Sequence, residues 1–140
     1  MSKKVLLLGG AGFIGFNISK FLAENRDYSI TIADNFARGK QDELFTALVK
    51  KHNIKVVPGD FTDPKTYDAL DNAYDQVYML ASVVGVDNAN SIPHEIIRIN
   101  TGLIYNTLEW VRRSKIGKVL FTSTSECYAG TVDAFGYTIP

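Results

Sequence analysis

Short apolar runs alternate with stretches of helical spacing along this chain. Residues 5–8 are continuously apolar and stop at a cluster of glycines, a pattern typical of a strand buried on both faces of a parallel sheet. Four more short and mostly apolar runs lie at 28–33, 54–57, 75–80 and 118–122, and they also predict strands. Helical spacing begins at Phe13 and recurs over 40–51, 64–70 and 95–113. The pattern therefore predicts strands that are joined by helices.

This alternation of strand and helix indicates the fold class. It predicts an α/β protein with a Rossmann-like doubly wound parallel sheet and helices on both faces. Asp63 followed by Pro64 predicts a helix cap, and residues 81–93, which are small and polar, predict an irregular surface loop. Trp110 is predicted to pack in the core or against a partner helix. The apolar positions of the first two helices that are predicted to face inward are Ile14, Ile18, Phe21, Leu22, Leu44, Leu48 and Val49.

Composition narrows the function. The chain has 140 residues, which suits one domain. Its 15 basic and 15 acidic side chains cancel, which gives no reason to expect a nucleic-acid or membrane-surface partner. Cys127 is the one cysteine, so a reducing, cytoplasmic location is expected. One cysteine and two distant histidines predict no metal site.

A glycine-rich turn follows the first apolar run. Gly9, Gly12 and Gly15 fit the pattern GxxGxxG between a predicted strand and a predicted helix. Such a turn lets the backbone approach a pyrophosphate, and the helix start offers free N–H groups to that anion. The glycine pattern alone is weak evidence for a dinucleotide site, but the predicted strand before it and the predicted helix after it strengthen that evidence.

Asp34 ends the second apolar run, about 20 residues beyond the glycines. A carboxylate there can accept hydrogen bonds from both hydroxyls of an adenosine ribose and would repel a 2′-phosphate, so NAD is favoured over NADP. Arg38 lies close enough to weaken that preference slightly. The alternative is that Asp34, followed by Asn35, serves a turn or a helix cap.

Six segments resemble the extended short-chain dehydrogenase/reductases, the NAD-dependent sugar-nucleotide epimerases, dehydratases and decarboxylases. They are GGAGFIG at 9–15, DNF at 34–36, GDFTD at 59–63, YMLAS at 78–82, Asn100 with NTLE at 106–109, and FTSTSECY at 121–128. The sequence departs from the family pattern at Leu8, Met79 and Ser82, where Thr, His and Ala are usual, and at Leu103 and Ile104, where Gly and Thr are usual.

The resemblance and the spacing together assign the cofactor and its contacts. The expected cofactor is NAD. The residues expected to bind it are Gly9, Gly12, Phe13, Ile14, Gly15, Asp34, Asn35, Phe36, Arg38, Asp60, Phe61, Leu80, Ala81, Ser82, Asn100 and Thr122. By resemblance, Asp60 and Phe61 would flank the adenine.

The resemblance implies a reaction that begins with hydride transfer from a nucleotide-sugar to NAD⁺ and gives a 4-keto sugar. Thr124 matches the catalytic Ser/Thr that hydrogen-bonds the sugar oxygen, and Glu126 matches an acid that assists proton transfer. The alternatives are a plain strand-end residue for Thr124 and a solvated loop acid for Glu126. The triplet Thr124-Ser125-Glu126 does not decide between epimerase, dehydratase and decarboxylase.

The family's catalytic Tyr-x-x-x-Lys does not occur in these 140 residues. We therefore expect residues 1–140 to be the NAD-binding portion of a longer enzyme, whose tyrosine, lysine and C-terminal substrate lobe lie beyond this chain. A sixth strand is expected to be absent too, which would leave an apolar sheet edge. The resemblance implies a homodimer when the protein is intact. The alternative function is a non-catalytic dinucleotide-binding or redox-sensing module.

Overall fold

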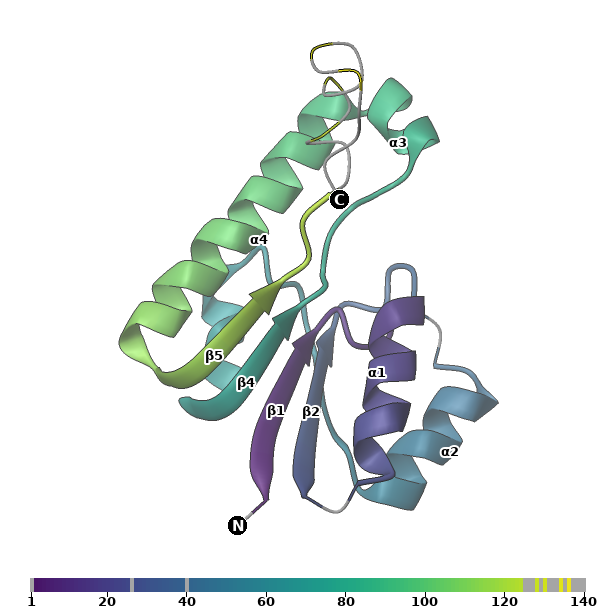
Figure 1. The fold of residues 1–140 in the computed structure, drawn as a ribbon, viewed down its shortest axis with the longest axis vertical. Coiled ribbons are helices and arrows are strands. Elements are labelled where there is room, and N and C mark those ends of the chain that lie inside the picture. Colours follow the sequence, from purple (N-terminus) through teal and green to yellow (C-terminus); the bar gives the residue numbers. More distant parts are fainter. Residues whose placement is uncertain are drawn as a thin grey trace.

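Five parallel strands form one sheet in the computed structural model, which describes residues 2–25, 27–39, 41–124, 128, 130, 134 and 136. The strands are β1 (Lys3–Leu8), β2 (Tyr28–Asp34), β3 (Lys55–Pro58), β4 (Ala73–Met79) and β5 (Lys115–Phe121). Their order in the sheet is β3-β2-β1-β4-β5. Leu8 is in register with Ala33 and Met79, and Met79 with Phe121. The carboxyl ends therefore meet at one end of the sheet (Figure 1).

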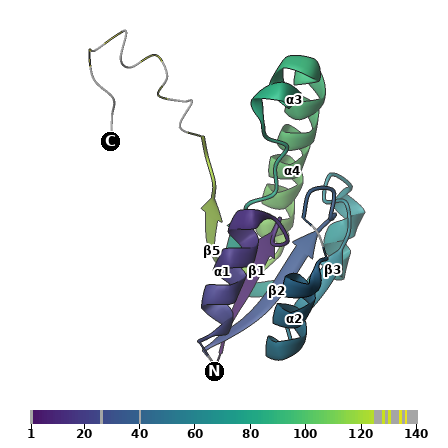
Figure 2. The ribbon, with the colours of Figure 1, turned by 90° about the vertical axis from the view of Figure 1, so that its right-hand side faces the viewer.

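Helices cover both faces of the sheet, which confirms the predicted doubly wound α/β fold (Figures 1 and 2). On one face lie α1 (Phe13–Ala23) and α2 (Glu43–His52). The other face carries α4 (Pro93–Arg113) and the 3₁₀ helix η1 (Pro64–Ala69). Asp63 caps η1 as predicted, since its carboxylate accepts a hydrogen bond from the Lys65 N–H at 2.9 Å.

Alternation along β1 builds two cores. Leu6 and Leu8 point to the α4 face, whereas Val5 and Leu7 point to the α1 face, and all four are 0–1% exposed. Trp110 joins the first of these cores with 3% of its surface exposed, which confirms its predicted place. A strand that buries both faces explains why the run at 5–8 shows no polar alternation.

Three local predictions were wrong. The segment 81–93 was expected to be irregular, but it contains α3 (Val86–Ser91). In α1, Ile14 and Phe21 are 58% and 76% exposed, because the helix turns Gly15, Ser19 and Leu22 inward instead. In α2, Leu44 is 70% exposed and Phe45 takes the inward position.

Ser19 lies on the inner side of α1 and is fully buried. Its hydroxyl has no hydrogen-bond partner among the described residues, and leaving such a group unsatisfied costs free energy. We expect Ser19→Ala to raise the free energy of unfolding by about 1 kcal/mol, since it removes the hydroxyl and alanine also favours a helix. Urea denaturation followed by circular dichroism measures the change.

Thr107→Val is the matched control, because the Thr107 hydroxyl is equally buried but hydrogen-bonded. It lies 2.8 Å from the Tyr67 hydroxyl and 2.7 Å from the Leu103 carbonyl. This variant is expected to destabilise the protein by about 1–3 kcal/mol, because it leaves Tyr67 without its buried partner. A lower urea midpoint for Ser19→Ala would show that the hydroxyl stabilises the helix after all.

Candidate dinucleotide-binding site

The sheet brings the predicted site segments side by side at its carboxyl end. The Gly9 N–H donates to the Ala33 carbonyl at 2.8 Å, and the Leu80 N–H donates to the Leu8 carbonyl at the same distance. These bonds join the segments that follow β1, β2 and β4. The strand order reverses between β1 and β4, the point where open α/β sheets hold their ligands.

Two glycines are required by the packing of the loop itself. Gly9 has a φ of +80°, and a Cβ there would lie 2.6 Å from the Ala81 nitrogen. A Cβ on Gly15 would lie 2.5 Å from the Gly10 Cα. Only glycine fits either position, so the start of α1 and the loop after β4 can both approach the turn closely.

Gly12 differs from these two glycines. Its φ is −70°, and a Cβ there would meet one atom, the Gly9 carbonyl oxygen, at 3.4 Å. The fold would therefore tolerate a larger residue at position 12. A ligand that approaches the backbone there would explain why the residue is glycine. Gly12 is the N-cap of α1, and within this fully described helix no side chain caps the start and no acid lies in the first turn.

The uncapped start of α1 suits an anion, because the first N–H groups of a helix have no partner inside the helix. The side chains of Phe13 and Ile14 are 85% and 58% exposed. Because Phe13 and Ile14 lie in the first turn of α1, where N–H groups have no partner inside the helix, these N–H groups can serve a pyrophosphate.

Asp34 lies between the glycine loop and the loop that follows β2. It is 8% exposed, and its two carboxylate oxygens accept from the Ala11 N–H at 2.9 Å and from the Phe36 N–H at 2.8 Å. Each oxygen keeps a second lone pair for a ribose hydroxyl. Asn35 and Arg38 are exposed beside it, and the Asn35 side chain accepts from the Ala37 N–H at 3.0 Å.

The loop after β3 is fixed from within and from α4. The Asp60 carboxylate accepts from both the N–H and the hydroxyl of Thr62, at 2.9 and 2.8 Å. Phe61 is 4% exposed, and its ring packs edge-on against Tyr67 with 5.1 Å between ring centroids. Because the Phe61 ring is buried in the core, only the backbone of Phe61 could contact an adenine.

Asn106 is a residue that the sequence prediction did not place in the site. Its amide donates to the Thr62 carbonyl at 2.8 Å and so ties the 59–63 loop to α4. The resemblance of the NTLE segment at 106–109 to the family pattern could have pointed to Asn106. The periodicity of a helix, however, does not show which loop an asparagine side chain contacts.

Asn100 acts on the loop after β4. Its amide donates to the Val83 carbonyl at 2.9 Å and accepts from the Val83 N–H at 2.8 Å. It therefore holds the segment that begins with the half-buried Leu80 and Ala81 and the exposed Ser82. This arrangement favours a positioning role over the direct cofactor contact expected from the sequence.

At the end of β5, the Thr122 hydroxyl donates to the Met79 carbonyl at 3.0 Å. Thr124 follows on the exposed stretch beyond β5, at the same end of the sheet as the glycine loop. Glu126 and Cys127 lie outside the described residues.

A sequence profile described as the NAD dependent epimerase/dehydratase family matches residues 5–136. This chain belongs to that family. NAD is accordingly its cofactor, as the glycine loop and Asp34 indicated. The Rossmann-like sheet is the fold expected of such a member.

Two curated relatives are named as enzymes of nucleotide-sugars. The chain is 36% identical over 130 residues to UDP-N-acetyl-alpha-D-glucosaminuronate decarboxylase of Bacillus cytotoxicus, covering 91% of the chain and 38% of that protein. It is 34% identical over 126 residues to dTDP-glucose 4,6-dehydratase of Mycolicibacterium smegmatis, covering 89% and 37%. The chain thus spans less than two fifths of these relatives' length.

The fold is similar to that of UDP-glucose-4-epimerase from Stenotrophomonas maltophila, solved with bound NAD and formylated UDP-arabinopyranose. The TM-score is 0.79 at 22% identity, over 90% of this chain and 38% of that one. At this identity the likeness shows the shared fold. The arrangement of Gly12, the start of α1 and Asp34 independently fits the family's dinucleotide.

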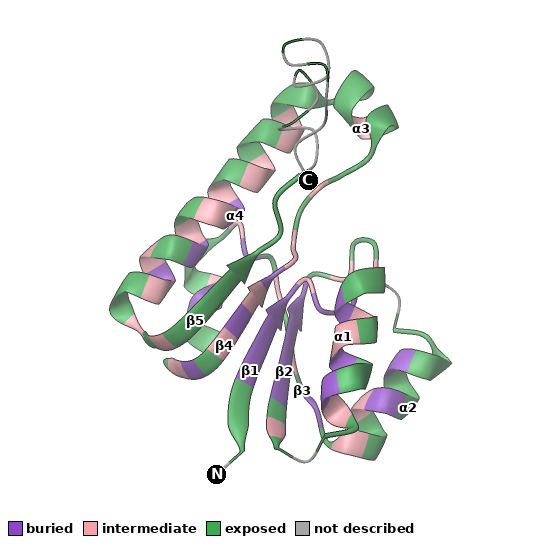
Figure 3. Ribbon diagram, viewed as in Figure 1, coloured by how far each residue is buried: buried purple, intermediate pink, exposed green. Residues whose placement is uncertain are grey.

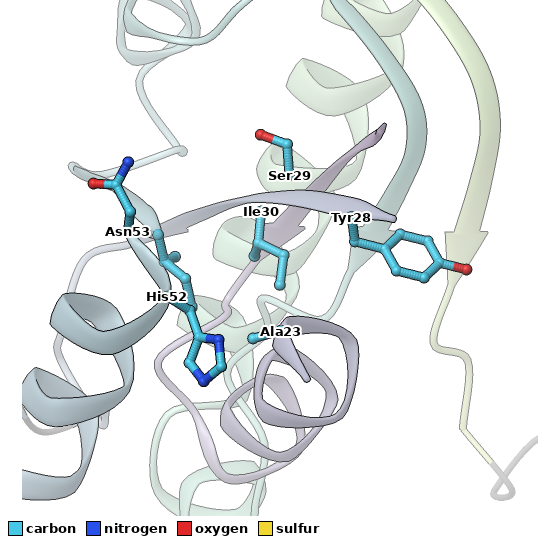
Figure 4. A pocket seen from close by; sticks show the side chains of 7 residues that line it. Ala23, Tyr28, Ser29, Ile30, His52 and Asn53 are labelled. Atoms are coloured by element: carbon cyan, nitrogen blue, oxygen red, sulfur yellow. The ribbon is translucent and has the colours of Figure 1, made fainter. Parts of the chain in front are cut away.

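Two hollows lie near α2, and one of them reaches the family's glycine loop. A hollow of about 350 Å³ is lined by Ala11, Gly12, Phe13, Phe16, Asn17, Asp42, Leu44 and Phe45. The other lies at the opposite, amino end of β2. Figure 4 shows that its polar side chains, those of Tyr28, Ser29, His52 and Asn53, point in different directions. They therefore do not converge on one ligand.

No group of three His, Cys, Asp or Glu side chains among the described residues is arranged to hold a metal ion. None of the described helices is both long and apolar enough to cross a membrane.

Proposed function

We propose that this chain is the NAD-binding portion of an NAD-dependent nucleotide-sugar epimerase or dehydratase that acts through a 4-keto-sugar intermediate. The observation that carries the proposal is the uncapped start of α1 next to the buried carboxylate of Asp34 at the switch point of the sheet. Family membership over residues 5–136 supports it, and the curated relatives act on nucleotide-sugars.

Each group of residues would bind a different part of the cofactor. The Phe13 and Ile14 amides would hold the pyrophosphate, Asp34 the adenosine ribose, and Asp60 with the Phe61 backbone the adenine. When bound, NAD supplies the hydride acceptor for oxidation of the sugar. Thr124 would hydrogen-bond the sugar oxygen that becomes the ketone. Glu126 would assist proton transfer at the sugar.

The exposed strand β5 supports a longer enzyme. Val119, Leu120 and Phe121 are 38%, 45% and 52% exposed, and Figure 3 shows β5 largely exposed while β1 and β2 are buried toward their carboxyl ends. A further strand beside β5 and a covering layer would bury these side chains. We place the catalytic Tyr-x-x-x-Lys and the substrate lobe in that further part. The cytoplasmic homodimer expected from the sequence belongs to the same proposal.

The cofactor role of Asp34 is tested by titrating the chain with NADH and with NADPH. NADH is expected to bind more tightly, because the carboxylate accepts from the ribose hydroxyls and repels a 2′-phosphate. Asp34→Ala is expected to weaken NADH binding by at least about tenfold, which is the effect of losing even one of its two hydrogen bonds to the ribose. NADPH binding should change less, so the gap narrows.

The control for this titration is Asp63→Ala, which removes another loop carboxylate and a helix cap without touching the proposed ribose contact. It is expected to leave the ratio of the two affinities unchanged. Equal affinities for NADH and NADPH in the unmodified chain would count against the ribose role of Asp34.

The codons that follow Pro140 separate the enzyme from the non-catalytic module. A Tyr-x-x-x-Lys there would support the enzyme, and oxidation of a UDP- or dTDP-sugar by the complete gene product would then be assayed by product analysis. A stop codon directly after Pro140 would favour the dinucleotide-binding module.

A further inference from the structure

We infer that Phe36 and Phe45 form a clamp that positions Asp34 and the glycine loop before the cofactor binds. Phe45 belongs to α2, so this helix would influence cofactor affinity through the clamp. The inference rests on the proposed function, because it assigns a positioning role for the same site.

The clamp begins with an unusual backbone. Phe36 has a φ of +57°, a left-handed conformation that bulky side chains rarely adopt and that persists only when the surroundings hold it. In this conformation the Phe36 N–H donates to one oxygen of the Asp34 carboxylate at 2.8 Å. The turn at Phe36 therefore fixes the orientation of Asp34.

Phe45 supplies the holding contact. Its ring lies edge-on to the Phe36 ring, with 5.8 Å between centroids and an interplanar angle of 83°, a favourable aromatic geometry. Phe45 is 5% exposed, and Phe36 packs against the core cluster that Phe45 belongs to. The first turn of α2 is fixed as well, because the Asp42 carboxylate accepts from the Phe45 N–H at 2.8 Å. The anchor is thus part of the rigid core.

The second carboxylate oxygen of Asp34 connects this turn to the glycine loop. It accepts from the Ala11 N–H at 2.9 Å. Ala11 also lies close to Gly39, where a Cβ would lie 2.5 Å from the Ala11 carbonyl oxygen. The segment between β2 and α2 passes beside the start of α1 (Figure 1). Ala11 is therefore in contact with Asp34 and with Gly39, which flank the turn that Phe36 and Phe45 fix.

The test compares variants that release the clamp. Phe36→Gly removes the ring but adopts the left-handed backbone without strain, and Phe45→Leu removes the anchoring ring from α2. Amide hydrogen exchange, measured without ligand, reports on the Ala11 N–H. In both variants this amide is expected to exchange about tenfold faster, beyond any change in global stability, because its charged acceptor is no longer fixed.

Tyr74→Leu is the matched control. It removes a buried aromatic ring from a contact with Trp110 on the other face of the sheet, so it lowers stability without touching the clamp. Its Ala11 exchange should follow global stability alone. Unchanged Ala11 protection in Phe36→Gly, or equal acceleration in Tyr74→Leu, would overturn the inference.

NADH titration provides the second readout. The dissociation constant is expected to rise by about tenfold in Phe36→Gly and Phe45→Leu and to stay constant in Tyr74→Leu. If the unmodified chain binds no NADH, the proposed function fails, while Ala11 exchange still decides whether the clamp exists. Accelerated exchange with unchanged NADH affinity would show a clamp that does not position the cofactor site, which also contradicts the inference.

Discussion

Gly15→Ala is expected to lower the free energy of unfolding by about 3 kcal/mol. The added Cβ would lie 2.5 Å from the Gly10 Cα and 2.6 Å from the Gly9 carbonyl oxygen. Both are backbone atoms of the tight turn, so relief requires α1 to move away from the sheet or the turn to open. A domain of this size has only about 5–15 kcal/mol of stability in total. Urea denaturation followed by circular dichroism measures the loss.

Gly102→Ala is the control for this variant, because it makes the same change inside another helix. A Cβ at Gly102 would meet nothing within 4 Å. There the substitution is expected to stabilise the protein by about 0.5–1 kcal/mol, since alanine loses less conformational freedom on folding. Similar urea midpoints for the two variants would contradict the close packing of Gly15 on the turn.

Gly12→Ala is expected to weaken NADH binding by about tenfold to a hundredfold while the fold stays intact. The added Cβ would point into the open space at the start of α1 and hold a pyrophosphate away from the Phe13 and Ile14 amides. A hydrogen bond to a charged group contributes about 1.5–3 kcal/mol, and losing one corresponds to this range of affinity. Fluorescence titration with NADH measures the effect.

The stability of Gly12→Ala distinguishes a ligand role from a folding role. Its Cβ would meet only the Gly9 carbonyl oxygen, at the ordinary contact distance of 3.4 Å, so the free energy of unfolding should fall by less than about 1 kcal/mol, the cost of alanine at an N-cap. Gly102→Ala serves again as the control and should bind NADH normally. If Gly12→Ala bound NADH with wild-type affinity, this result would contradict the role of the glycine loop in cofactor binding.

Much of the fold was predictable, because strand and helix patterns depend on neighbours along the chain. Short apolar runs predicted the five parallel strands, although β5 is largely exposed. The capping pair Asp63 and Pro64 marked the start of η1. The site's location followed as well, since all carboxyl ends of parallel strands meet at one end. The helix faces were harder to predict. Phe21 and Leu44 have the hydrophobicity of core residues, yet α1 and α2 turn other residues inward.

The sequence by itself determined which segments meet at the site: the glycine loop, the stretch after Asp34, and the loops after β3, β4 and β5. Only the tertiary structure decided what each side chain does there. It showed that the Asp34 carboxylate accepts hydrogen bonds from Ala11 and Phe36 and that the Phe61 ring is buried. It also showed that the Asn100 side chain is hydrogen-bonded to the Val83 backbone. Asp34 and Phe36 are only two residues apart, but Ala11 lies 23 residues from Asp34 and Asn100 lies 17 residues from Val83. The distances between these remote partners depend on how closely α1, α2 and α4 pack on the sheet. Local periodicity carries no information on that packing.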